Sequence, residues 1–469
     1  MHLPRISALI FVVALVAASC SGDDTTDNTI DLVLRGAVSN DYGTPPTTPT
    51  GPLGAGLVAD LDLTFASISS DVDNEAIARV GASGDPRVAW LLTDILRFTQ
   101  PGTAISDAVF RAWEEVTGRS VSGPDSRWAL TTNHMLAWDT PAPPGYIEWK
   151  RQVFELIEPR WAPLFDDPDA TIDWRWISWG GVLIDDRPLD QTHLGCLEGC
   201  IPALDDPGLT DAAGGSWYRD DRVVFGIVMG DEAVAFPKNI MEVHEMVNMA
   251  IGGRRIGVPY CTLCGSAQAY FTDNVSPAAD LGDGDTYELR TSGLLSRSNK
   301  VMYEFHTKSV FDTFTGEAVT GPLRAAGVTL EQITVETATW ADWRAAHPNT
   351  QIIAEDGGIG RTYPEDPLRG RDDNGPIFPI GDTDPRLGVQ EPVIGVTNAD
   401  GVPVAFPVAI AGSALDDGET VTHAGVTIRS EGAGFTAHST ADDEPLVAHQ
   451  AFWFAWSQFH PDTELWARP

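Results

Sequence analysis

Apolar residues in the first third of the chain recur with the period of an α-helix. Asp85-Pro86 combines a helix N-cap with proline at the first helical position, and an apolar face follows it. A second helix is predicted to end at Gly118, and a third before Pro159. We therefore expect packed helices in a mainly helical domain over residues 57–190.

From about residue 220 the pattern changes to short β-type runs separated by Gly, Pro and Asp. Residues 224–228, followed by V-A-F-P, are echoed by residues 393–397, again followed by V-A-F-P. The string W-x-x-W-x-x-x-H-P begins both at Trp340 and at Trp453. Two matches in the same order predict a tandem duplication. The predicted fold class is α+β, with a helical region followed by a duplicated β-rich module.

This pattern divides the chain into six segments. They are a signal peptide (1–20), a disordered polar tether (21–56), the helical domain (57–190), a first β-rich repeat (191–356), a connecting segment (357–389) and a second, degenerate repeat (390–469). Residues found in both copies are expected to serve the shared fold, so His347 and His460 are poor catalytic candidates. Function is expected in the segment that the second copy lacks, about 238–320.

The N-terminus has the features of a bacterial lipoprotein signal. Arg5 precedes an apolar run over residues 6–18 that is too short to span a membrane comfortably, and small residues lead to Cys20. The alternative is an ordinary signal peptide cleaved nearby. We expect an exported protein, anchored through lipid on Cys20 to the outer face of the cell membrane. The Pro- and Thr-rich residues 44–52 then belong to the tether.

The net charge excludes one class of partner. With 30 basic and 67 acidic residues the charge is 30 − 67 = −37. A field of this sign repels phosphate backbones and anionic lipid. We therefore expect no nucleic acid partner, while a protein partner or a small substrate stays open.

Four cysteines remain besides Cys20. Cys196 and Cys200 have C-x-x-x-C spacing, and Cys261 and Cys264 form C-x-x-C-G. The second pair lies between two β-type runs, which predicts a strand, a tight knuckle and a strand whose backbone N–H groups point at sulfur. Metal binding, two structural disulfides and a redox-active pair all fit this spacing in an exported protein.

A helix is predicted over residues 238–251, ended by two glycines, with His244 and Asn248 on one face. The string His244-Glu245-x-x-Asn248 resembles a zincin motif whose second histidine is lost, so a protease is not favoured. His244 and, less strongly, His193 are candidate ligands beside the cysteines. Glu245 or Asn248 would orient His244.

Two further groups of residues have a structural and a functional interpretation. Four of the seven methionines lie close to His244, where thioether, thiolate and imidazole together would favour copper(I), then zinc. Core packing is the simpler explanation of the methionines. Ser292, Arg297 and Asn299 lie in a predicted polar loop, as the mouth of a pocket or as ordinary turn residues.

Residues 196–469 resemble the bacterial domain-of-unknown-function family 3179. The resemblance rests on these strings: His244-Glu245-x-Val247-Asn248, Gly252-Gly253, Tyr260-Cys261-x-Leu263-Cys264-Gly265, Ser292-Gly293-Leu294-Leu295, Ser298-Asn299, Met302-Tyr303, Thr339-Trp340, His347-Pro348 and residues 451–456, with residues 201–205 after the first cysteine pair. The family implies no activity, so it supports the architecture and the choice of residues only.

This chain departs from the family pattern near the cysteines. Met249 replaces a common aspartate, Thr262 a proline, and Glu304-Phe305 an Asp-Arg pair, while Val310-Phe311 replaces Leu-Trp. A polar network built on that aspartate and on the Asp-Arg pair is therefore not expected here.

Three hypotheses follow, and whether the protein is an enzyme stays open. In the first, Cys261, Cys264 and His244, with Cys196 and Cys200, hold copper or zinc for binding or redox work. In the second, Cys261 and Cys264 act as a thiol–disulfide oxidoreductase. In the third, two disulfides staple a non-catalytic extracellular interaction module.

Overall fold

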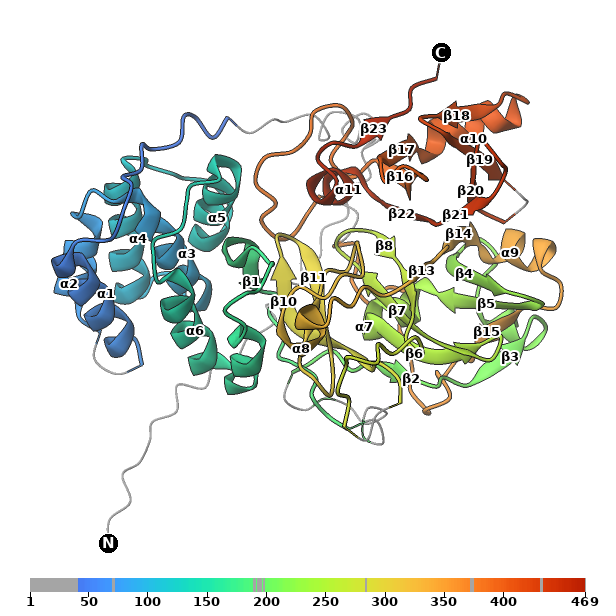
Figure 1. The fold of residues 1–469 in the computed structure, drawn as a ribbon, viewed down its shortest axis with the longest axis horizontal. Helices are drawn as coiled ribbons and strands as arrows, with labels where there is room; N and C mark the ends of the chain where they lie inside the picture. The colour runs from blue at the N-terminus through green and yellow to red at the C-terminus, as the bar shows by residue number, and fades with distance from the viewer. Residues whose placement is uncertain are drawn as a thin grey trace, which may run out of the picture.

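The fold was analysed in a computed structural model, which describes residues 41–69, 72–188, 191, 196, 199–282, 285–371, 375–430 and 433–468. Within these residues a helical region packs beside a β-rich region, as predicted (Figure 1). Cys20 and His193 lie outside the described residues.

The helical region holds six α-helices in the described residues. They are α1 (Ala55–Ser67), α2 (Asn74–Gly81), α3 (Ala89–Phe98), α4 (Ala104–Thr117), α5 (Arg127–Trp138) and α6 (Tyr146–Ile157). Two predicted ends are confirmed: Gly118 closes α4 at φ 64°, and α6 ends before Pro159. The Asp85 carboxylate accepts a hydrogen bond from the backbone N–H of Arg87, so the predicted cap forms too.

The predicted tether is in part held in place. Residues 41–53 contain no helix or strand. However, the Trp138 indole donates to the carbonyl of Tyr42 (3.0 Å), and Arg87 donates to the carbonyl of Gly51 (2.8 Å). The prediction of disorder is therefore wrong for these residues, because they run along the helices.

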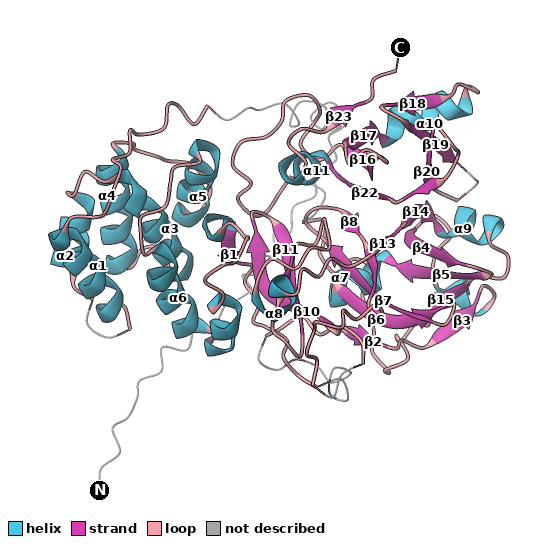
Figure 2. Cartoon of the chain, in the orientation of Figure 1, coloured by secondary structure: helices cyan, strands magenta, loops and turns pink. Residues whose placement is uncertain are grey.

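The described strands form five sheets, arranged as the blades of a propeller (Figures 1 and 2). In order across each sheet, sheet 1 consists of β1 (Ile177–Trp179), β10 (Leu289–Ser296), β11 (Asn299–Glu304) and β12 (Val310–Phe311). Sheet 2 consists of β13 (Gln332–Ile333), β9 (Ala269–Phe271), β7 (Arg254–Cys261), β6 (Met246–Ile251) and β2 (Leu204–Asp205), and β8 (Ser266–Ala267) pairs with β7; sheet 3 consists of β14 (Glu336–Thr339), β4 (Val223–Met229), β5 (Glu232–Pro237), β15 (Gln351–Ile353) and β3 (Leu209–Asp211). Sheet 4 consists of β22 (Ala448–Phe452), β16 (Pro392–Thr397), β17 (Pro403–Pro407) and β23 (Glu464–Leu465), and sheet 5 of β18 (Val421–His423), β19 (Val426–Ser430), β20 (Phe435–Ser439) and β21 (Pro445–Leu446). The remaining helices are α7 (Lys238–His244), α8 (Gly321–Ala325), α9 (Trp340–Ala346), α10 (Val408–Asp416) and α11 (Trp453–Phe459).

Sheets 3 and 4 have matching connectivity. Each begins with a hairpin (β4–β5 or β16–β17) that is followed by a helix. The next strand (β14 or β22) pairs antiparallel with the first strand of the hairpin. After a second helix, a short strand (β15 or β23) pairs parallel with the second strand of the hairpin. These are the segments whose sequences echo each other. The two sheets therefore have the same topology. That they arose by duplication stays a prediction.

The repeated W-x-x-W and His-Pro strings serve these two sheets. The Trp343 indole donates to the Thr350 hydroxyl (2.8 Å), and its ring lies 4.2 Å from that of His347. The equivalent distances from Trp456 are 2.9 Å to the Thr463 hydroxyl and 4.1 Å to the ring of His460. Both strings therefore contribute to packing.

The helical region shares a hydrophobic core with sheet 1 of the β-rich region. Trp161 in the helical region donates to the carbonyl of Ser292 in β10 (2.7 Å), and Arg97 of α3 donates to the carbonyl of Trp179 in β1 (2.6 Å). The Arg97 guanidinium also lies 4.3 Å from the centre of the Trp128 ring. β1 lies within the predicted helical segment but pairs with β10, so sheet 1 includes a strand from before the first predicted repeat. Among the described residues, no helix has the length and apolar character needed to cross a membrane.

Residues 238–251 depart from the predicted helix. α7 ends at His244, Glu245 has a left-handed backbone (φ 52°), and β6 begins at Met246. The second half becomes a strand because it pairs antiparallel with β7 over six residues and is buried almost throughout. His244 and Asn248 therefore do not share a helix face.

Candidate functional site

The Cys261–Cys264 turn is the knuckle that the sequence predicts. Cys261 ends β7, the backbone N–H of Cys264 donates to the carbonyl of Cys261 (3.2 Å), and β8 begins at Ser266. Gly265 closes the turn at φ 57°, where a Cβ would also lie 3.0 Å from the Phe452 ring. The turn therefore requires glycine at this position.

Both thiols of the knuckle are free and buried. Cys261 is 1% exposed and Cys264 0%. Their sulfurs lie 3.7 and 3.6 Å from one acceptor, the carbonyl oxygen of Ser298, in the turn between β10 and β11. The two thiol groups also influence each other electrostatically. Sheets 1 and 2 thus bring two sulfurs and one carbonyl to a single point.

The two thiols are electrostatically unequal. Burial raises the pKa of Cys264 well above that of an ordinary thiol, and its hydrogen bond to Cys261 raises it further. Burial also raises the pKa of Cys261, but hydrogen bonds from the Cys264 side chain and from the backbone N–H of Lys300 outweigh this effect. Cys261 therefore has a pKa below the ordinary value and is the first of the pair to form a thiolate.

A buried ion pair lies beside the thiols. The Lys300 ammonium lies 3.8 Å from a Glu245 carboxylate oxygen and donates to the Glu245 carbonyl (2.5 Å) and the Thr291 hydroxyl (3.2 Å). The Thr262 hydroxyl donates to the other oxygen of the Glu245 carboxylate (3.4 Å). Burial raises the pKa of Glu245 and lowers that of Lys300. This chain thus has a polar network at the knuckle that includes Thr262, one of its departures from the family pattern.

Sequence reasoning missed Lys300 and Ser298 as parts of this site. Lys300 is one of four lysines in the chain and directly follows the Ser298-Asn299 string, which is the only signal that marks it. Its burial depends on the pairing of β11 with β10, which the local pattern does not reveal. Among the described residues, the Ser266 and Ser298 hydroxyls and the Asn299 amide oxygen are buried near the knuckle without a hydrogen-bond partner.

The structure does not place His244 as a metal ligand. Its Nδ1 lies 2.8 Å from the carbonyl oxygen of Pro202, so Nδ1 carries the proton and donates. Its Nε2 must then accept from the Tyr363 hydroxyl, 2.7 Å away. Burial, with a smaller contribution from Arg361, lowers the pKa of His244 to about 4. Because both ring nitrogens are engaged, the predicted ligand role is not supported.

The first cysteine pair has a different role from the second. Cys196 and Cys200 form a disulfide with each other, so neither offers a thiolate to a metal. The predicted five-residue ligand set is therefore not assembled. Across the residues that the structure describes, no group of three or more His, Cys, Asp or Glu side chains is arranged to hold a metal ion.

Three other residues that the sequence suggested for the site, Asn248, Ser292 and Arg297, make structural contacts. Asn248 donates to the Asp205 carboxylate (2.8 Å) and to the carbonyl of Leu289 (3.0 Å), so it fixes β2 beside β6. The Ser292 hydroxyl donates to the carbonyl of Val301 (2.5 Å). The Arg297 guanidinium stacks on Trp176 at 4.2 Å and thus faces the helical region.

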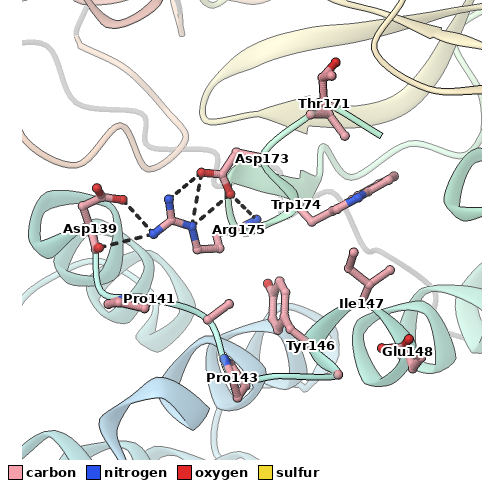
Figure 3. A pocket seen from close by; sticks show the side chains of 13 residues that line it. Asp139, Pro141, Pro143, Tyr146, Ile147, Glu148, Thr171, Asp173, Trp174 and Arg175 are labelled. Atoms are coloured by element: carbon pink, nitrogen blue, oxygen red, sulfur yellow. Dashed lines mark hydrogen bonds and ion pairs between the residues drawn. The ribbon is translucent and has the colours of Figure 1, made fainter. Parts of the chain in front are cut away.

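A pocket of about 860 Å³ opens on the helical region, outside the thiol site (Figure 3). Arg175 lies at its edge, 2.8 Å from a carboxylate oxygen of Asp139 and 2.6 Å from one of Asp173. Its charge is already balanced by these two partners. We therefore assign this pocket no ligand.

Comparisons with known proteins give a family but no activity. No curated protein and no solved structure matches the chain. Residues 198–420 match the family model described as "Protein of unknown function (DUF3179)", and this segment contains the knuckle, Lys300 and Glu245. The helical region lies outside the matched segment. The predicted resemblance to the DUF3179 family is thus confirmed over residues 198–420.

Proposed function

We propose that Cys261 and Cys264 form a redox-active dithiol. The observation that carries this proposal is the convergence of two free thiols on each other and on the carbonyl of Ser298, whereas the other cysteine pair is bonded. A vicinal dithiol whose members have pKa values shifted in opposite directions has the arrangement needed for exchange: one sulfur attacks as thiolate while the other keeps its proton.

The reaction is exchange with a low-molecular-weight disulfide. The Cys261 thiolate attacks one sulfur of that disulfide and releases the first small thiolate, which takes up a proton. Cys264 then loses its proton and attacks the mixed disulfide at Cys261, releasing the second small thiol. The protein pair is oxidised to a disulfide and the small disulfide is reduced to two thiols. The burial of both sulfurs favours a small reaction partner over a folded protein.

A second candidate function is the binding of copper(I) by the same two sulfurs. Their convergence on one carbonyl supports it, because copper(I) favours soft thiolate ligands. Zinc has less support, because structural zinc sites use four ligands, and His244 and the first cysteine pair are engaged elsewhere. The third hypothesis, a module stapled by two disulfides, loses support because Cys261 and Cys264 are free.

The proposed location is the outer face of the cell membrane, with lipid on Cys20 as the anchor. The Cys196–Cys200 disulfide supports an oxidising compartment. Incorporation of a radiolabelled fatty acid into the full chain, and its loss in Cys20→Ala, tests the anchor.

We expect thiol labelling of the full chain, equilibrated with oxidised and reduced dithiothreitol at varied ratios, to show reversible oxidation of Cys261 and Cys264 together. Cys261→Ser and Cys264→Ser should each abolish the two-electron step. Thr436→Ala, in β20 of sheet 5, keeps both thiols and the polar network of the knuckle and serves as the control. Peptide mass spectrometry identifies the oxidised pair.

The same samples separate the alternatives. Copper(I) bound at one equivalent under anaerobic conditions, and lost in both cysteine variants, would favour the second candidate. Thiols that stay reduced at every ratio and bind no copper would contradict both functions and make the knuckle structural.

A further inference from the structure

A second cavity, of about 550 Å³, lies between sheet 3, α7 and residues 354–365. It is separate from the residues of the thiol knuckle, and its volume is in the range of small-molecule sites. Tyr363 lines this cavity, and its hydroxyl donates a hydrogen bond to His244, which belongs to the string shared with the family. His244 therefore holds a side chain of the cavity wall in position. The next residue, Glu245, belongs to the thiol site.

Two arginines line this cavity without a carboxylate partner. Among the described residues, neither Arg222 nor Arg361 forms an ion pair with an acidic side chain. Arg222 donates to a backbone carbonyl, that of Glu365, and its guanidinium lies 5.1 Å from the ring centre of Tyr218. The Arg361 guanidinium lies 5.7 Å from the ring centre of Tyr363. In a chain with 67 acidic and 30 basic residues, two unpaired arginines that line one cavity indicate a place for an anionic ligand.

The acidic residues of the cavity lie at its exposed rim. Glu355, Asp356 and Glu365 are all exposed. Glu365 lies 3.9 Å from a third arginine, Arg219, which also pairs with Asp221 (2.6 Å). Solvent and Arg219 therefore offset the negative charge of these rim residues. The positive charges of Arg222 and Arg361 stay available to a ligand.

Two buried polar atoms add directional groups to this cavity. The Asn239 amide oxygen and the Trp217 indole N–H both belong to lining residues, and neither has a hydrogen-bond partner among the described residues. Asn239 is only 3% exposed, so leaving its oxygen unpaired is costly. An acceptor and a donor in the lining residues, together with two cations, match a ligand that carries an anion and hydroxyl groups.

The aromatic side chains of the cavity wall indicate which kind of ligand surface would pack against them. Trp217, Tyr218 and Tyr363 present aromatic surface, and the Tyr218 hydroxyl is already used in a bond to the carbonyl of Val223 (2.6 Å). Ring faces of this kind pack against flat or weakly polar surfaces. We propose that this cavity binds a small hydroxylated carboxylate of the size of a sugar acid, with its carboxylate on Arg222 and Arg361 and its hydroxyls on Asn239 and Trp217.

The test is isothermal titration of the full chain with D-glucuronate, followed in parallel by tryptophan fluorescence. D-glucose, which lacks the carboxylate, is expected not to bind at the same concentrations. Arg222→Gln and Arg361→Gln should each weaken glucuronate binding about tenfold or more, and Asn239→Leu should weaken it by a similar factor. Arg429→Gln in sheet 5, whose partner is Asp443, is the matched control and should bind as the parent does.

Three results would overturn the proposal: no glucuronate binding at millimolar concentration, equal binding of glucose, or binding that the three substitutions leave unchanged. Inorganic phosphate in a third arm shows whether the arginines take any anion, and phosphate binding without glucuronate binding also overturns the assignment. The unmutated protein gives a further check, because glucuronate binding must weaken as salt rises. Cys261→Ser should bind glucuronate normally, since the thiol site is separate.

Discussion

Alanine at Gly226 or at Gly395 is expected to destabilise the protein by about 3 kcal/mol at each site, near the upper end for overpacked cores. A Cβ at Gly226 would lie 2.1 Å from the Trp343 ring, and one at Gly395 would lie 2.1 Å from the Trp456 ring. Both indoles are buried and hydrogen-bonded at their nitrogen, so they have little room to move. The glycine is therefore needed so that the indole can lie flat on the strand.

Urea unfolding midpoints of the full chain provide the measurement. Gly412→Ala is the matched control, because Gly412 lies inside α10 and a Cβ there meets its nearest neighbour, the Phe435 ring, at an ordinary 3.4 Å. It should be neutral or stabilise by up to about 1 kcal/mol. An unchanged midpoint at both Gly226 and Gly395 would contradict the packing argument. Sensitivity at only one would contradict the equivalence of sheets 3 and 4.

Lowering the pH from about 6.5 to about 4 is expected to remove about 3 kcal/mol of stability for each fully buried neutral histidine. Burial lowers the pKa of His244 to about 4, of His449 to about 3 and of His460 to about 4, from an ordinary value of 6.5. Below pH 6.5 the unfolded chain takes up protons that the folded chain refuses, so stability falls as the pH falls. Above pH 7 both states are neutral at these positions and stability is flat. His460 should contribute less than the other two, because it is partly exposed.

The difference between the parent and His449→Gln isolates one of these contributions. Buried acids whose pKa is raised, such as Glu245, make the protein more stable as the pH falls, which opposes the effect of the histidines. These acids are present in both proteins, so their effect cancels when the two stability curves are subtracted. We expect the stability of His449→Gln to depend less steeply on pH between 6.5 and 4, measured as urea midpoints at each pH. His438→Gln, in β20, is the control. Parallel curves for the parent and His449→Gln would contradict this explanation.

Much of the architecture was predictable because it depends on short-range rules. Gly118 ends a helix through its left-handed backbone, and Asp85 caps one through its carboxylate. The knuckle was predictable for the same reason, since two cysteines with Gly265 between β-type runs favour a tight turn. The prediction over 238–251 was wrong because apolar residues near His244 fit both a helix and a buried strand, and pairing with β7 decided between them.

The candidate site was predictable in part. Cys261, Cys264 and Glu245 do lie together, and Lys300, marked only by its place after the Ser298-Asn299 string, completes the group. His244, Cys196 and Cys200 were predicted to join them, yet each is bonded to another partner. Sequence spacing shows which side chains have the right chemistry, but the partner of each is set by contacts between distant segments. The bond from His244 to Tyr363 spans 119 residues and is one such contact.

The sequence alone determined the helical region, the β-rich region, the repeated strand–helix strings and the cysteine turn, because backbone conformation and hydrophobic period act over a few neighbouring residues. Only the tertiary structure decided that Cys261 and Cys264 stay free beside a buried lysine, and that Arg222 and Arg361 meet in one cavity. These outcomes depend on the packing of β10 and β11 against β7, and of residues 354–365 against sheet 3. Burial and long-range pairing change the chemistry of a side chain, and neither is encoded in its immediate neighbours.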